Sequence, residues 1–148
     1  MKLIGEYFYN IDSKGRIIIP SEFKDELGER FFLVKGLEKC LTLYSEKAWE
    51  ELLLKIEILP ISNPYARSLI RFFGSGAKEC TLDPQGRITI PPSLKIHANL
   101  DKKAVFVGLF NKAEIWSSET WQKVQNSDYK GKSALSEEFS QHIIDLGV

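Results

Sequence analysis

The sequence contains few of the residues that most often indicate metal sites, disulfides or membrane insertion. Two cysteines and two histidines occur in 148 residues, and Cys40, Cys80, His97 and His142 show no metal-ligand spacing. No apolar run approaches the roughly 20 residues that a membrane span requires, and residues 1–6 lack the apolar core of a signal peptide. We therefore expect a cytoplasmic protein with reduced cysteines and with no metal, cofactor or membrane partner.

The sequence also lacks an excess of charge of either sign. It holds 20 basic and 20 acidic residues, so its formal net charge is zero. Binding to nucleic acid would then depend on a local cluster of Lys and Arg, multiplied by self-assembly, and not on the overall field of the molecule. With 43% hydrophobic and 27% charged residues, the chain has the composition of a globular protein with one core or two small related ones.

An internal repeat organises the chain. Residues 11–20 (IDSKGRIIIP) match residues 82–91 (LDPQGRITIP) at an offset of 71, and residues 33–37 (LVKGL) match residues 105–109 (VFVGL) at an offset of 72. Two homologous halves follow from this match. We expect repeat 1 at residues 5–47, a helical connector at 48–75, repeat 2 at 76–119 and a helical C-terminal tail at 120–148.

Both halves are predicted to consist mainly of β-hairpins. Apolar and β-branched residues predict strands at 16–19, 31–35 and 41–44, and again at 87–90, 104–107 and 113–116. Aromatic residues near matched repeat positions are expected in the core, namely Phe8, Tyr44, Trp49, Trp116 and Trp121.

The connector is predicted to hold two helices. Ser45 is a favourable N-cap for the first helix, which ends before Pro60. Asn63 is a favourable N-cap for the second helix, with Pro64 at its first position and Gly74 just after its end. Apolar residues at helical spacing predict one more helix in the tail, over residues 136–146.

The pattern Asp-x-x-Gly-Arg occurs once in each half. Asp is favoured at the first position of a type I turn and Gly where φ is positive, so the pattern predicts a rigid turn at the tip of a protruding hairpin. A turn does not require the Arg that follows the Gly. The turn-forming residues are Asp12, Gly15, Asp83 and Gly86.

The repeated Arg predicts a DNA-binding surface. Arg can grip a phosphate or form paired hydrogen bonds to guanine, and a two-stranded ribbon fits the major groove. The alternative role for this Arg is a structural salt bridge to the turn Asp, and the two roles can coexist. The candidate DNA-binding residues are Ser13, Lys14, Arg16, Gln85 and Arg87.

Together these motifs resemble the MraZ family. The resemblance rests on the doubled Asp-x-x-Gly-Arg and the Ile-Pro that follows it, on Asn63-Pro64 with Arg67 and Arg71, and on residues 107–112 (VGLFNK) with Glu114 and Trp116. It implies an α+β fold of two tandem AbrB/SpoVT-like swapped-hairpin halves that form a small β-barrel, with connecting helices and a C-terminal helix.

The same resemblance implies a ring-shaped homo-oligomer and a nucleoid-associated transcriptional regulator. Such a regulator binds repeated boxes of double-stranded DNA in the promoter of its own division and cell-wall gene cluster. A ring presents its DNA-binding residues in the same rotational sense, so we expect the boxes to be direct repeats and not a palindrome.

Two other classes of function remain open at this point. An antitoxin-like protein-interaction module of the swapped-hairpin fold usually carries one such half and a disordered tail, whereas this chain carries two halves. A pseudo-symmetric hydrolase would pair Asp12 with Asp83, with a perturbed carboxyl pKa as its signature. An Asp that holds a turn has its oxygens engaged by backbone amides, so we expect neither an enzyme nor a small-molecule substrate.

Overall fold

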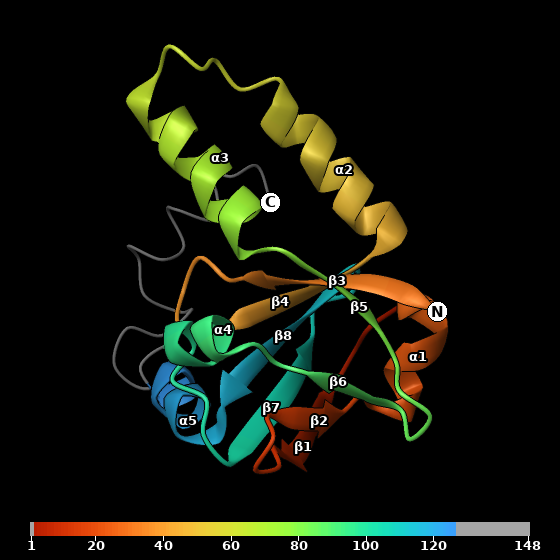
Figure 1. The fold of residues 1–148 in the computed structure, drawn as a ribbon. Helices are drawn as coiled ribbons and strands as arrows, with labels where there is room; N and C mark the ends of the chain where they lie inside the picture. The colour runs from red at the N-terminus through yellow and green to blue at the C-terminus, as the bar shows by residue number, and fades with distance from the viewer. Residues whose placement is uncertain (1, 127–148) are drawn as a thin grey trace. The chain divides into compact units, whose positions relative to one another are not determined.

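The computed structural model describes residues 2–126, which form a mixed fold of helices and mainly antiparallel strands (Figure 1). Two strands, a helix and two further strands follow one another in each half, so the order of elements repeats as the sequence repeat predicts. The first half contains β1 (Glu6–Asn10), β2 (Arg16–Ile18), α1 (Ser21–Leu27), β3 (Arg30–Lys35) and β4 (Leu41–Ser45). The second half contains β5 (Lys78–Thr81), β6 (Arg87–Thr89), α4 (Pro92–His97), β7 (Lys103–Gly108) and β8 (Lys112–Ser117).

The main sheet has six strands in the order β1-β7-β8-β4-β3-β5. The two predicted strand pairs of the halves, β3 with β4 and β7 with β8, are both present. Each half also contributes a strand to the other, since β1 pairs with β7 and β5 pairs with β3. The expected small barrel is not observed in the part of the chain that the structure describes, because the sheet stays open, with β1 and β5 at its edges.

The remaining two strands form a separate ribbon that corrects the hairpin prediction. We expected the Asp-x-x-Gly turn to join two paired strands, but β2 pairs with β6 of the other half while β1 pairs with β7. The ribbon places Ile17 opposite Ile88, and the two side chains are only 1% and 3% exposed. Burying each such side chain contributes about 1.5–3 kcal/mol, which favours exchange between halves over a local hairpin.

One hydrophobic core serves both halves. It includes Ile17, Phe23 and Leu33 from the first half and Ile88 and Phe106 from the second. Of the aromatic residues expected in the core, Tyr44, Trp49 and Trp116 are buried and Trp121 is half-buried. The expectation for Phe8 is wrong, because it lies on the outer face of edge strand β1 and is 63% exposed. The two halves therefore stabilise one another through shared burial.

The connector consists of α2 (Glu46–Glu57) and α3 (Pro64–Gly76), which lie side by side beyond the β3 and β4 strands (Figure 1). The predicted caps are confirmed: Ser45 Oγ accepts from the amide of Ala48, and Asn63 Oδ1 accepts from the amide of Tyr65. A second cluster that includes Trp49 holds the pair against β3 and β4. The predicted end at Gly74 is too early, because this glycine keeps a helical φ and α3 continues to Gly76.

The last described helix is α5 (Ser118–Asn126), where Glu119 and Lys123 form an ion pair one turn apart. The helix predicted at residues 136–146 lies outside the described residues. Within residues 2–126, every helix is too short or too polar to cross a lipid bilayer.

Candidate nucleic-acid interface

The first Asp-x-x-Gly-Arg unit forms a closed turn held by one carboxylate. Asp12 Oδ1 accepts hydrogen bonds from the amides of Lys14 and Arg16, both at 2.9 Å. The other oxygen, Oδ2, accepts from Arg16 Nε at 2.7 Å. The amide of Gly15 donates to the Asp12 carbonyl at 3.0 Å, and Gly15 has the predicted positive φ of 78°. The Asp therefore shapes the turn and also orients the Arg.

The second unit repeats this arrangement. Asp83 Oδ1 accepts from the amides of Gln85 and Arg87, and Oδ2 accepts from Arg87 Nε at 2.8 Å. Gly86 has a φ of 77°, and its amide donates to the Asp83 carbonyl. The structural salt bridge considered at the sequence level is thus present in both halves.

These hydrogen bonds lower the pKa of both aspartates below the ordinary value of 3.8. The largest cause in each case is the hydrogen bond from the backbone amide of the arginine, Arg16 or Arg87. Bonds to the ionised form favour ionisation. A hydrolase with paired carboxylates needs one carboxyl group with a raised pKa, and Asp12 and Asp83 both shift the other way.

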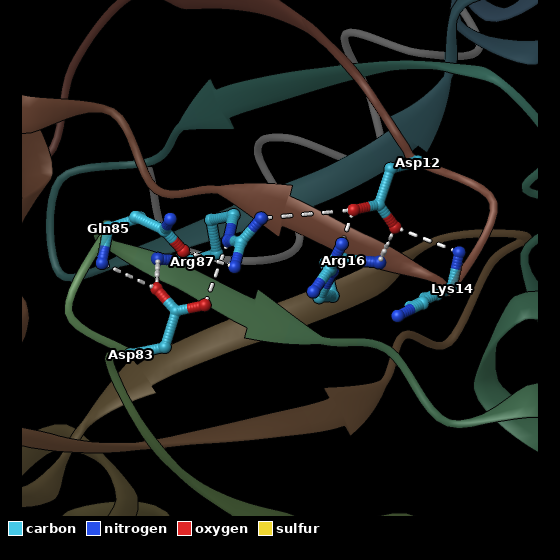
Figure 2. Close-up of polar contacts among 6 residues, drawn as sticks. All are labelled: Asp12, Lys14, Arg16, Asp83, Gln85 and Arg87. Carbon is cyan, nitrogen blue, oxygen red and sulfur yellow. Dashed lines mark hydrogen bonds and ion pairs between the residues drawn. The ribbon is translucent and has the colours of Figure 1, made fainter.

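The two arginines lie on one face of the β2–β6 ribbon (Figure 2). Arg16 is opposite Thr89 and Arg87 is opposite Ile18, so both side chains face away from the buried Ile17–Ile88 pair. The side chains of Arg16 and Arg87 are 31% and 22% exposed. Strand exchange thus brings together two arginines that are 71 positions apart in the sequence.

Arg87 has contacts that Arg16 lacks. Its Nη2 donates to Gln85 Oε1, and its Nη1 lies 4.0 Å from Asp12 Oδ2 (Figure 2). The Asp12 carboxylate therefore forms ion pairs with both Arg16 and Arg87. Within residues 2–126, no hydrogen bond or ion pair engages the two η nitrogens of Arg16.

Each turn is anchored to the opposite half by its glycine carbonyl. The carbonyl of Gly15 accepts from the amide of Ile90 at 2.8 Å, and the carbonyl of Gly86 accepts from the amide of Ile19 at 3.0 Å. Ile19 and Ile90 are almost completely buried, at 0% and 1% exposure. Backbone hydrogen bonds therefore join both turns to residues of the shared core.

The other predicted contact residues are exposed at the turns: Ser13 and Lys14 in the first and Gln85 in the second. Sequence reasoning missed two lysines that approach the turns from the opposite half. A Cβ built on Gly86 would lie 2.7 Å from Lys24 Nζ, and one built on Gly15 would lie 3.8 Å from Lys95 Cδ. Lys24 and Lys95 occupy matched repeat positions, 71 residues apart, and this match is the signal that could have identified them.

The residues with other chemical potential have structural surroundings. Cys40 and Cys80 are buried free thiols, and burial raises the pKa of both, that of Cys80 to about 11. His97 Nε2 lies 2.9 Å from the carbonyl oxygen of Gly36. Residues 2–126 contain no group of three or more His, Cys, Asp or Glu side chains that could hold a metal ion. His142 lies outside this range.

The comparisons with known proteins agree with one another in the family that they indicate. A family model described as "MraZ protein, putative antitoxin-like" matches the chain twice, over residues 3–72 and 73–142. The chain is 43% identical over 146 residues to a protein of Thermoanaerobacter sp. (strain X514) named Transcriptional regulator MraZ, with 99% of each chain covered. It is 47% identical over 146 residues to a protein of the same name from Alkaliphilus metalliredigens (strain QYMF), with 98% of this chain and 99% of that protein covered. The double match of one model confirms the internal repeat.

Proposed function

Since the chain belongs to the MraZ family, we propose that it is a sequence-specific DNA-binding transcriptional regulator that contacts its promoter through the two Asp-x-x-Gly-Arg turns. The observation that carries this proposal is the pair of arginines, Arg16 and Arg87, on the exposed face of one ribbon. Relatives from two organisms carry the name Transcriptional regulator MraZ, which supports the same class of function. A cytoplasmic, nucleoid-associated location is consistent with it.

The contacts of Arg16 are suited to reading a base. Asp12 holds the Nε of Arg16, so the planar guanidinium is oriented before DNA arrives. An oriented guanidinium loses less conformational entropy on binding than a freely rotating one. Its two η nitrogens remain available for paired hydrogen bonds to the O6 and N7 atoms of guanine or to a phosphate. Arg87 is proposed to contact the same DNA beside it.

Self-assembly is the second part of the proposal. With a formal net charge of zero, one protomer presents few cations to DNA, and several copies would have to act together. Strand β1 lies at an edge of the sheet, and Phe8 in this strand and Ile4 just before it are 63% and 57% exposed, which supplies apolar surface for a contact between copies. We propose a ring-shaped homo-oligomer whose copies bind direct-repeat boxes upstream of the protein's own gene.

Replacing Arg16 tests the assignment of the turn. We expect Arg16→Ala to weaken binding to the DNA upstream of the gene by about fivefold to 150-fold, because an Arg that reads a base contributes about 1–3 kcal/mol. Arg16→Lys keeps the charge and loses the paired hydrogen bonds, so it should lose discrimination against an unrelated duplex more than overall affinity. Fluorescence anisotropy titrations against both duplexes measure the two effects.

The control for this experiment is Arg71→Ala, which removes an exposed arginine from helix α3 of the connector. It should bind both duplexes as the wild type does. Thermal melting checks that the Arg16 variants, in which the ion pair with Asp12 is changed, still fold. If Arg16→Ala melts normally and binds the upstream duplex as tightly as Arg71→Ala, the turn does not read DNA.

An antitoxin-like protein-interaction module is the second candidate, and the description of the matching family model favours it. In this case the chain would bind one protein partner through a surface other than the arginine ribbon. Binding to the partner should then survive Arg16→Ala, whereas binding to DNA should not.

A further inference from the structure

Basic residues of the second half gather around the turn of the first half. A hollow of about 510 Å³ lies beside the first turn, and its lining includes Asp12, Ser13, Lys95, Lys102 and Lys103. A neighbouring hollow of about 700 Å³ shares Ser13 and Lys95 with the first, and its lining includes Lys14. The first turn is therefore flanked by four ammonium groups, three of which come from the other half of the chain.

Backbone pairing fixes these lysines beside the turn. Lys103 is the partner of Asn10 in the β1–β7 pair, and the carbonyl of Lys102 accepts from the amide of Ile11 at 2.8 Å. The bond from the amide of Ile90 to the Gly15 carbonyl brings the start of α4, and with it Lys95, next to the turn. The cluster is thus a product of strand exchange between the halves.

The side chains in the cluster are available to a partner. Lys14, Lys102 and Lys103 are exposed and Lys95 is half-buried. Within residues 2–126, no ion pair engages any of the four. The described lining of the first hollow includes two carboxylates, Asp12, which is held in the turn, and Asp101. The surroundings of the first turn consequently carry a net positive charge in a molecule with none overall.

The elements of the first half that match this cluster in the repeat carry a different charge. Helix α1 holds one lysine, Lys24, and three carboxylates, which gives a net charge of −2, whereas the matched helix α4 holds Lys95 and no carboxylate. Gln85 replaces Lys14, and Arg30 occupies the position matched to Lys102. Arg30 is bound to Glu46 and Glu79, so its charge is compensated. These differences in charge favour a polyanion beside the first turn over one beside the second.

We propose that Lys95, Lys102 and Lys103 bind the phosphate backbone of the DNA beside the first turn, so that each protomer holds phosphate through lysines at only one of its two DNA-contacting turns. This inference rests on the proposed function. Contacts of Lys with phosphate fix the orientation of a protein on the duplex and carry no sequence information, while Arg16 on the same turn supplies the contact to a base. Because the lysines lie beside the first turn, the pseudo-symmetric ribbon would bind the DNA in one orientation.

The decisive comparison is between Lys95→Gln and Lys24→Gln, two substitutions at matched positions of the repeat. Binding to the upstream duplex and to an unrelated duplex is titrated at several salt concentrations. We expect Lys95→Gln to weaken binding to both duplexes. The plot of log K against log salt has a negative slope, and its magnitude should decrease by about 1, since each phosphate contact releases about one counterion. The double variant Lys102→Gln with Lys103→Gln should lower it by about 2. Lys24→Gln should reduce affinity and slope by less than Lys95→Gln does.

Failure of this inference can be distinguished from failure of the proposed function. If Lys95→Gln and Lys24→Gln have the same slope as the wild type, while Arg16→Ala loses discrimination, the protein reads DNA without the lysine anchor and this proposal is wrong. Equal losses in Lys95→Gln and Lys24→Gln would also overturn it, since both turns would then anchor alike. If the wild type does not distinguish the two duplexes, the proposed function itself is wrong.

Discussion

At the scale of single residues, Asp12 and Asp83 each hold a turn and the arginine that follows it. Each carboxylate accepts two backbone amides of its own turn and the Nε of the following Arg. The shape of the turn and the direction of the guanidinium therefore depend on the same two oxygen atoms. The ionised carboxylate is needed for both, because a neutral group accepts these hydrogen bonds more weakly.

The Asp83→Asn variant should show how far this depends on charge. We expect its melting temperature to be lower than that of the wild type at pH 7, because the amide offers one oxygen to three donors. The pKa of Asp83 is lowered in the folded state, so its stabilisation is complete above the ordinary value of 3.8 and is lost as the pH falls through the lower folded value. The gap between variant and wild type should therefore shrink below about pH 3.8.

Calorimetric melting at pH 7, 4 and 3 measures this gap. Asp25→Asn is the matched control, because Asp25 is an exposed carboxylate of α1 that makes no hydrogen bond or ion pair within residues 2–126. The control should melt as the wild type does at each pH. A gap for Asp83→Asn that is constant from pH 7 to pH 3 would show that the carboxylate charge does not hold the turn.

Residue preferences predicted the turns well. Asp at the first position and Gly at a positive φ follow from local chemistry, and both turns show them. Local chemistry also allowed the salt bridge of the Arg to the turn Asp, which is present. It could not predict Lys24 and Lys95, because these lysines approach the turns only after the halves have exchanged strands.

At the scale of elements, the sequence predicted where strands and helices lie better than it predicted their partners. Predicted and observed limits of β3, β4, β7 and β8 differ by at most one residue at each end. The predicted partner of β2 was wrong, since a turn between two short apolar segments favours a hairpin on local grounds alone. The burial of Ile17 against Ile88, which decides the pairing, depends on residues 71 positions apart.

Strand exchange predicts that neither half folds alone. A break between residues 60 and 61, in the exposed loop that joins α2 to α3, gives the fragments 1–60 and 61–148. Fragment 1–60 loses the partners of β1 and β2, and fragment 61–148 loses those of β5 and β6. We expect each fragment alone to melt without a cooperative transition, and an equimolar mixture to regain one, as followed by circular dichroism.

A chain cleaved at this loop after folding is the control. It should keep its cooperative transition, because the loop contains no strand of either sheet and all strand pairs remain after the cut. A cooperative transition in fragment 1–60 or in fragment 61–148 alone would mean that the first or second half has its own stable core, contrary to the shared core observed.

At the scale of the whole molecule, the absence of net charge determines how DNA has to be bound. A protomer with one anchoring turn makes few phosphate contacts, and binding of that kind has dissociation constants of about 10⁻⁴–10⁻⁶ M at physiological salt. Such affinity does not hold a promoter against competing genomic DNA. Several copies in one assembly raise the effective concentration of each further contact, so avidity can supply the missing affinity.

An assembly whose protomers each anchor through the first turn would present those turns in the same rotational sense. The matching DNA should then carry direct repeats spaced by about one helical turn, roughly 10 bp, so that every box faces the protein. We expect affinity to rise steeply from duplexes with one box to those with two and three. Moving one box by half a turn should return a two-box duplex to the affinity of one box, because the moved box faces away. Gel-shift titrations with these duplexes, beside sedimentation velocity of the free protein, make the measurement. Equal affinity for one and three boxes, or no effect of the half-turn shift, would contradict binding by an ordered assembly.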